Sequence, residues 1–119
     1  MNFKDLGISE PLVQVLKKSG ITTPTSIQEE CIPLIKDYKD VIAQAQTGTG
    51  KTLAFLLPLF ENISPDVCAT QALIITPTRE LALQITEEAN QLAKGKAINV
   101  LAAYGGRNIG SQLNKLKGT

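Results

Sequence analysis

At 119 residues, with 43% hydrophobic side chains, the chain is long enough for one globular core and too short for two ordinary domains. Twelve basic residues nearly balance eleven acidic ones, which leaves a formal net charge of +1. Composition therefore carries no electrostatic signature of a nucleic acid, an acidic substrate or a membrane surface. Any such partner has to be inferred from local motifs.

The chain has no histidine, and its two cysteines, Cys31 and Cys68, are far apart. This excludes the usual metal-ligand spacings and Ser-His or Cys-His catalysis, and we expect both cysteines to be reduced, buried and structural. The first ten residues lack the basic and apolar regions of a signal peptide, and the longest apolar run, residues 53–60, is too short to cross a bilayer. The sequence predicts a soluble cytoplasmic protein with no membrane partner.

Two helices are expected first. Ser9 can cap a helix of about residues 10–18, with Gly20 placed as its terminator. Thr25 then opens a second helix that runs to about Lys36, and Pro33 is expected to bend or split it.

Strands and helices then alternate. Residues 41–45 (VIAQA) and 71–76 (QALIIT) predict two short buried strands. Between them, an apolar helix should begin at Lys51 and be kinked or end near Pro58, followed by a linker at residues 62–70.

The last part of the chain repeats this alternation. Thr78 should cap a helix over residues 79–93, whose apolar face comprises Leu81, Leu83, Ile85, Ala89 and Leu92 and leaves Glu87, Glu88 and Gln91 to solvent. Residues 97–104 predict a third strand, and residues 108–117 a short final helix. This order predicts an α/β fold: a parallel sheet flanked by helices, with active residues at the carboxyl ends of the strands.

The turn between the first strand and its helix has the features of a phosphate-binding loop. Gly48 and Gly50 allow backbone N–H groups to turn toward an anion at a helix N-terminus. Lys51 can reach the β- and γ-phosphates, and the Thr52 hydroxyl can take a place on Mg²⁺. Ala45 stands where the strict pattern has glycine, a position that needs a small residue. The alternative is an ordinary Gly-rich turn with a helix-starting lysine.

Three further short motifs accompany the phosphate loop AQTGTGKT: residues 20–28 (GITTPTSIQ), residues 77–82 (PTRELA) and the glycine doublet at residues 105–106. The loop itself comprises Ala45, Gln46, Thr47, Gly48, Thr49, Gly50, Lys51 and Thr52. In this order, the four motifs resemble the N-terminal part of a DEAD-box RNA helicase, in which the first of the three is the adenine-reading Q motif and the second an RNA-contacting motif. The resemblance implies a RecA-like P-loop domain, with a Q-motif helical segment at residues 1–39 and the first part of the ATP-binding domain at residues 40–119.

The resemblance also implies residue roles on the nucleotide side, with ATP and Mg²⁺ as ligands. Gln28 would read adenine, because a carboxamide can accept from N6–H and donate to N7. From spacing alone, Thr25 and Gln28 instead form a capping box, and the two roles need not exclude each other. Phe3 would pack near the base, although by itself it is a core aromatic. Ile21 stands where the family often has an aromatic, and would give apolar contact without stacking.

On the RNA side, the resemblance implies contacts from Pro77, Thr78 and Arg79 to the sugar-phosphate backbone, which would be tolerant of sequence. Gly105 and Gly106 would let RNA approach the protein backbone closely, and Arg107 would add a positive charge that suits phosphate. Without the resemblance, these residues indicate a helix cap, a solvated charge and a turn.

A working P-loop ATPase also needs an acidic residue at the end of another buried strand, and neither the second nor the third predicted strand supplies one. We therefore expect an incomplete domain, with hydrolysis and unwinding belonging to a longer parent protein and the fragment inactive alone. Its sheet would expose an apolar edge through which the fragment self-associates. Two alternatives stay open: a nucleotide- or RNA-binding module without turnover, and another kind of P-loop NTPase.

Overall fold

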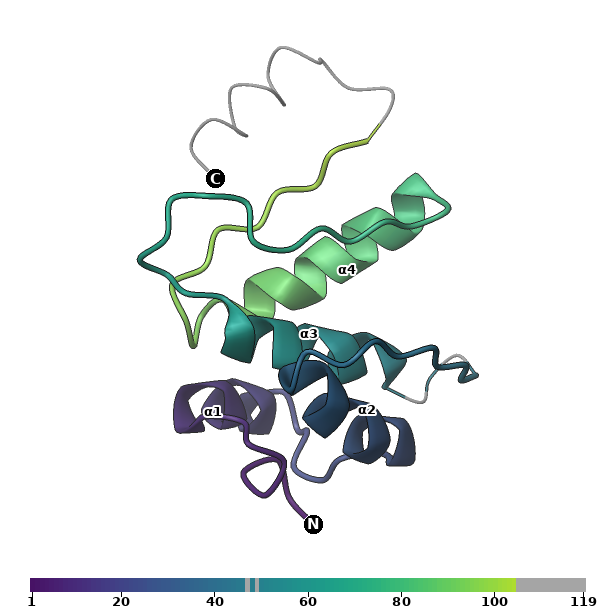
Figure 1. Cartoon of the computed structure of the whole chain (residues 1–119), viewed down its shortest axis with the longest axis vertical. Coiled ribbons are helices and arrows are strands. Elements are labelled where there is room, and N and C mark those ends of the chain that lie inside the picture. The colour runs from purple at the N-terminus through teal and green to yellow at the C-terminus, as the bar shows by residue number, and fades with distance from the viewer. Residues whose placement is uncertain (47, 49, 105–119) are drawn as a thin grey trace.

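The computed structural model of this chain describes residues 1–46, 48 and 50–104. Within these ranges it contains four helices: α1 (Glu10–Lys18), α2 (Ser26–Lys36), α3 (Lys51–Asn62) and α4 (Arg79–Leu92). In Figure 1, α3 lies between α4 on one side and α1 and α2 on the other. Helices α1, α2 and α4 begin and end within one residue of their predicted bounds, and α3 begins at the predicted Lys51.

The ends of α1 and α2 follow local capping rules. Thr25 and Gln28 form the predicted capping box at the start of α2. Gly20, at φ 80°, ends α1 as predicted, with the N–H of Ile21 donating to the carbonyl of Leu16. Ser9 precedes α1, but its side chain accepts no capping hydrogen bond there. Instead, the Ser9 N–H and hydroxyl both donate hydrogen bonds to the Glu61 carboxylate of α3.

The carboxyl end of α2 has the same motif as that of α1, without a glycine. The N–H of Tyr38 donates to the carbonyl of Ile35 at 2.9 Å, and that of Lys39 to the carbonyl of Leu34 at 2.9 Å. This geometry requires a left-handed residue, and Tyr38 adopts φ 60°. A side chain with a Cβ is strained in this conformation by about 1 kcal/mol or more.

Prolines do not end the helices that contain them. Pro58 is buried inside α3, which continues to Asn62; of the two predicted outcomes, a kink or an end near Pro58, the end was therefore wrong. Pro33 lies inside α2, which remains one helix rather than two. Each proline removes one backbone hydrogen bond of its helix, and at Pro58 the burial of the ring in the core offsets this loss.

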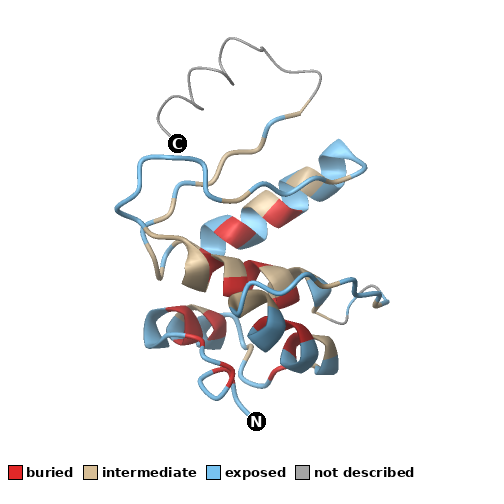
Figure 2. Ribbon diagram, in the orientation of Figure 1, coloured by how far each residue is buried: buried red, intermediate tan, exposed pale blue. Residues whose placement is uncertain are grey.

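One apolar core joins the N-terminal segment to all four helices (Figure 2). The residues before α1 contribute Phe3, Leu6 and Ile8, and α3 contributes Leu56, Leu57 and Phe60. The members from the other helices are Leu12, Val13, Leu16, Ile32, Ile85, Ala89 and Leu92. Because residues on both sides of position 40 share this core, the two proposed segments pack as one unit; the domain boundary itself stays a prediction.

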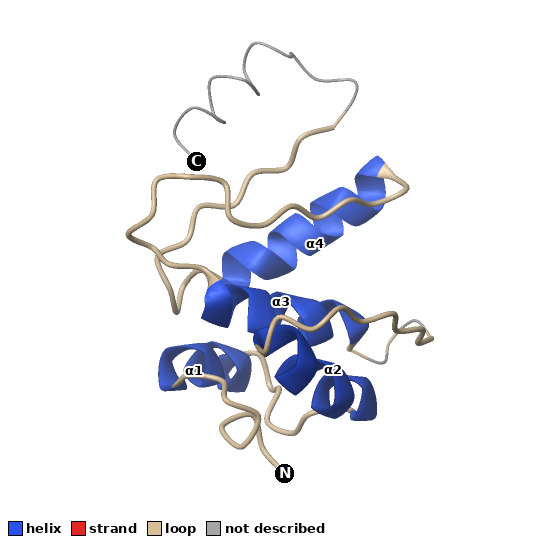
Figure 3. Ribbon diagram, viewed as in Figure 1, coloured by secondary structure: helices blue, strands red, loops and turns tan. Residues whose placement is uncertain are grey.

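The three predicted strands do not pair in the part of the chain that the structure describes (Figure 3). Residues 41–45, 71–76 and 97–104 are free of helix, but Ile42 is fully exposed and Ile75 is 86% exposed. The prediction that the first two are buried was therefore wrong for this chain. A parallel strand is buried only when it has neighbours at both edges and helices on both faces. Self-association through this apolar surface stays a prediction.

Three smaller expectations need correction or fall outside the description. In α4, Ile85, Ala89 and Leu92 are buried as predicted, but Leu81 and Leu83 are exposed among the described residues. Cys31 is buried, whereas Cys68 lies exposed in the linker after α3. The helix predicted at residues 108–117 lies outside the described residues. Among the described helices, none is long and apolar enough to cross a membrane.

The strain at Tyr38 gives a test of the helix ending. Tyr38→Gly should raise the free energy of unfolding by about 1 kcal/mol, measured by urea denaturation, because glycine adopts positive φ without a Cβ clash. Tyr38→Ala is the matched control, since it removes the ring and keeps the Cβ. Equal stabilities of the glycine and alanine variants would contradict the strained ending.

Candidate functional site

The loop before α3 has the backbone shape of an anion cradle. Gly50 is the N-cap residue of α3, at φ 79°, with no side-chain capping bond. Gly48 adopts φ 87° and has open space around the position of a Cβ. The first N–H groups of α3 therefore keep their hydrogen-bonding capacity, at the positive end of the helix dipole.

Lys51 and Thr52 form the first turn of α3. The Lys51 ammonium donates to the carbonyl of Ala45 at 3.1 Å, so the lysine folds back over the loop. Its side chain is exposed, while Thr52 is half-buried. A lysine that lies over a glycine loop at a helix N-terminus can stabilise a bound polyanion through charge as well as hydrogen bonds.

Gln28 ties this loop to α2. Its Oε1 accepts from the Thr25 N–H at 2.9 Å, and its Nε2 donates to the carbonyl of Gly50 at 3.0 Å. The side chain is only 2% exposed. A Cβ at position 50 would collide with the Gln28 amide nitrogen, so glycine is required there for space as well as for its positive φ.

These two bonds leave half of the Gln28 carboxamide unused. An amide oxygen has two acceptor sites and an NH₂ group has two donors, and one of each is committed here. The remaining acceptor and donor suffice for a two-bond contact with one edge of a base. The capping box thus leaves hydrogen-bonding capacity for base recognition, which stays a prediction.

A hollow of about 1130 Å³ lies beside the phosphate loop. Its lining includes Ile21, Gly48, Gly50, Lys51 and Thr52, together with Pro77 from the segment before α4. The structure therefore brings Ile21, one of the predicted base contacts, to the same hollow as the loop.

Two groups differ from the expected layout of this region. Phe3, predicted to pack near the base, is 2% exposed and belongs to the hydrophobic core. Glu88 of α4 lines the hollow, where burial raises the pKa of its carboxyl, with the neighbouring Glu87 adding a smaller effect. No cluster of potential metal ligands occurs in residues 1–46, 48 and 50–104.

The segment before α4 carries the second group of predicted contacts. Pro77, Thr78 and Arg79 are exposed. The Thr78 hydroxyl accepts from the Leu81 N–H at 3.1 Å, which confirms its role as a helix cap. The Arg79 guanidinium lies 5.7 Å from the centre of the Tyr104 ring, a cation–π contact between the first residue of α4 and the end of the third predicted strand.

Tyr104 contacts a predicted site residue, although sequence reasoning gave it no role. Its signal was a lone aromatic at the end of the third predicted strand, directly before the glycine doublet. Only the fold brings it beside Arg79. Five predicted site residues lie outside the described part of the chain: Thr47, Thr49, Gly105, Gly106 and Arg107.

The model of the DEAD/DEAH box helicase family matches residues 25–119, which is most of the chain. The chain belongs to this family. The match includes Gln28, the phosphate loop and the PTRELA segment, so the family assignment and the resemblance of the motifs agree.

Named DEAD-box relatives align with almost the whole chain. The ATP-dependent RNA helicase CshA of Limosilactobacillus reuteri is 50% identical over 117 residues, which are 98% of this chain and 24% of the relative. The ATP-dependent RNA helicase DeaD of Escherichia coli strain K12 is 44% identical over 116 residues, 97% of this chain and 18% of the relative. This chain thus spans about a quarter or less of the length of these curated relatives.

Solved DEAD-box structures share the fold. A DEAD box protein from the hyperthermophile Methanococcus jannaschii superimposes with a TM-score of 0.88 at 38% identity, over 99% of this chain and 32% of that one. The RNA helicase Prp28 from Chaetomium thermophilum, bound to ADP, superimposes with a TM-score of 0.86 at 37% identity, over 98% and 30% respectively. These neighbours are DEAD-box RecA-like domains, although the sheet predicted from the sequence is not formed by the described residues of this chain.

The two loop glycines form a matched pair for testing the Gln28 contact. Gly50→Ala and Gly48→Ala each place a Cβ on a left-handed residue, at a cost of about 1 kcal/mol. Gly50→Ala should lose about 1–2 kcal/mol more in the free energy of unfolding, because it also displaces the buried Gln28 amide from its bonds. Urea denaturation of both variants measures the difference; equal losses would contradict a tight packing of Gln28 on Gly50.

Proposed function

We propose that this chain binds ATP and RNA backbone as part of a longer DEAD-box ATP-dependent RNA helicase that works in the cytoplasm. The observation that carries the proposal is the glycine loop at the N-terminus of α3, bonded through the carbonyl of Gly50 to the buried amide of Gln28. One loop thereby connects a phosphate cradle to a group that can read a base. Family membership and the ATP-dependent helicase relatives support it.

The phosphate part of ATP fits the loop by charge and by space. Gly48 and the first N–H groups of α3 form a cradle that a Cβ at position 50 would disturb. Lys51 exchanges its bond to the Ala45 carbonyl for phosphate oxygens, which are stronger acceptors because they are charged. The Thr52 hydroxyl lies in the same first turn and would hold Mg²⁺ together with the phosphates. A bound Mg²⁺ would neutralise charge that develops on the phosphates.

The adenine would be read by the unused half of the Gln28 amide. Its free acceptor takes N6–H of adenine and its free donor reaches N7, whereas guanine presents an acceptor, O6, in place of N6–H₂. Ile21 would supply apolar contact from the hollow beside the loop, which Gln28 itself does not line. Because Gln28 is 2% exposed, the base has to displace the groups that cover it. Phe3, which is buried in the core, would support this region through packing rather than by direct contact.

RNA would bind beside the start of α4. Pro77, Thr78 and Arg79 are exposed at a helix N-terminus, where backbone N–H groups and a guanidinium suit phosphate oxygens. Gly105, Gly106 and Arg107 follow Tyr104 in the sequence, and Tyr104 contacts Arg79. Contacts to the backbone position RNA without reading its sequence. Unwinding and hydrolysis would require the rest of the longer protein, including an acidic group for Mg²⁺ and the attacking water.

Lys51 tests the phosphate part of the proposal. In the full-length helicase, Lys51→Ala should lower kcat/KM for ATP hydrolysis about a hundredfold or more, because a preorganised charge on the transferred phosphate is lost. A steady-state ATPase assay measures this, with Lys18→Ala, an exposed lysine of α1, as the control of equal charge. Near-normal hydrolysis by the Lys51 variant would refute the assigned role.

Arg79 tests the RNA part. Arg79→Ala should weaken RNA binding by a similar factor for unrelated sequences, and reduce the slope of log affinity against log salt by about 1. Fluorescence anisotropy at several salt concentrations gives both values. Lys94→Ala, which removes an exposed charge beyond the far end of α4, is expected to change neither. A loss confined to some RNA sequences would contradict a backbone contact.

A further inference from the structure

Helices α2 and α3 run in the same direction and are hydrogen-bonded to each other at both ends. At their starts, the Gln28 amide donates to the carbonyl of Gly50 at 3.0 Å. At their carboxyl ends, the Asn62 side-chain amide donates to the carbonyls of Ile35 at 3.3 Å and Lys36 at 3.2 Å. The helices are 11 and 12 residues long, so these side-chain hydrogen bonds at both ends, called clasps below, define the register of α2 against α3.

The direction of the Asn62 amide follows from its partners. Both are backbone carbonyls, which only accept, so the NH₂ group of Asn62 has to face them. The carbonyl of Ile35 also accepts from the N–H of Tyr38 and thus uses both of its lone pairs. A single half-buried side chain therefore holds the last turn of α2 against the last turn of α3.

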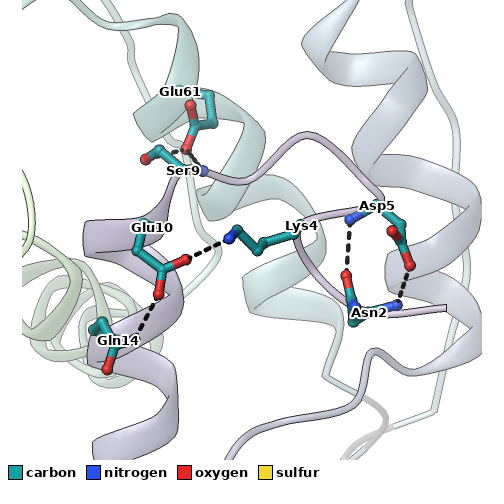
Figure 4. Close-up of polar contacts among 7 residues, drawn as sticks. All are labelled: Asn2, Lys4, Asp5, Ser9, Glu10, Gln14 and Glu61. Atoms are coloured by element: carbon teal, nitrogen blue, oxygen red, sulfur yellow. Dashed lines mark hydrogen bonds and ion pairs between the residues drawn. The ribbon is translucent and has the colours of Figure 1, made fainter.

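The turn that carries Asn62 is itself anchored. The Glu61 carboxylate accepts from the Ser9 N–H at 2.8 Å and from the Ser9 hydroxyl at 2.9 Å, and so caps α1 from another helix (Figure 4). The Lys96 ammonium donates to the carbonyls of Phe60 and Glu61, at the negative end of the α3 dipole. Asn62 thus projects from a fixed point that is tied to α1 and to the segment after α4.

We propose that Asn62 is a positioning residue for base recognition. By clasping the carboxyl end of α2, it holds that helix in the register that places the Gln28 amide at Gly50. A helix of 12 residues is about 18 Å long, so Asn62 acts from far outside any nucleotide contact. This role rests on the proposed ATP binding, because it concerns the residue assigned to adenine.

A Glu61 variant is the control that distinguishes this positioning role from a general effect on stability. It lies in the same turn and makes two hydrogen bonds, but it clasps α1 rather than α2. Loss of either side chain weakens the packing around α3. Only loss of the Asn62 clasp frees the helix that carries Gln28.

The experiment compares Asn62→Asp with Glu61→Ala in the full-length helicase. The aspartate has nearly the size of asparagine, but its oxygens repel the two carbonyls. Asn62→Asp should raise KM for ATP about tenfold, leave KM for GTP unchanged and keep kcat within about twofold, because the two-bond contact with adenine gives discrimination of that order. Glu61→Ala should leave the ratio of the two KM values as in the wild type.

Hydrogen exchange without nucleotide is the second readout. In Asn62→Asp, the peptide that covers residues 24–30 should exchange faster than in the wild type, although it lies at the opposite end of α2, whereas Glu61→Ala should leave its rate unchanged. Unchanged exchange in Asn62→Asp, or an equal drop in ATP preference in both variants, overturns the positioning role. A wild-type protein without preference for ATP overturns the proposed function, and with it base recognition, while the exchange rates still decide whether Asn62 holds Gln28 in place.

Discussion

The hydrogen bond from the Gln28 amide to the carbonyl of Gly50 is the constraint on which the rest of the site depends. It joins the first turn of α2 to the residue that starts α3, so the two helices begin at one point. Gly50 has to lack a side chain to permit the contact and has to adopt positive φ to start the helix. The glycine loop and the buried Gln28 amide are consequently held together at one corner of the fold.

The burial of Gln28 explains why its amide has a fixed orientation. Gln28 is the one buried polar side chain among the described residues. Hydrogen bonds to Thr25 and Gly50 offset the cost of removing its amide from water. A buried amide with fixed partners has one orientation, so its remaining hydrogen-bond donor and acceptor point in defined directions. A nucleotide that meets this amide finds a preorganised donor and acceptor, which costs less entropy than ordering a mobile side chain.

The helices were predictable because their signals are local. The Thr25 capping box, the Thr78 cap and the Gly20 ending each act within a few residues, and the structure has all three. The strands were not confirmed, because a strand exists only through pairing with a neighbour and the three predicted segments do not pair in the described residues. Ile42 and Ile75 are exposed for that reason, even though their apolar character is typical of buried strands.

By itself, the sequence determined the family and predicted the chemistry of the site. Glycines, a lysine and a threonine in that order predict a phosphate loop, because such a loop binds an anion through its own backbone. The tertiary structure alone decided how the loop is held. Glu61, Asn62 and Lys96 carry no local signal, since each bonds to backbone or side-chain atoms more than twenty-five residues away. Only packing brings those partners within hydrogen-bonding distance, and it also places Phe3 in the core and Tyr104 beside Arg79.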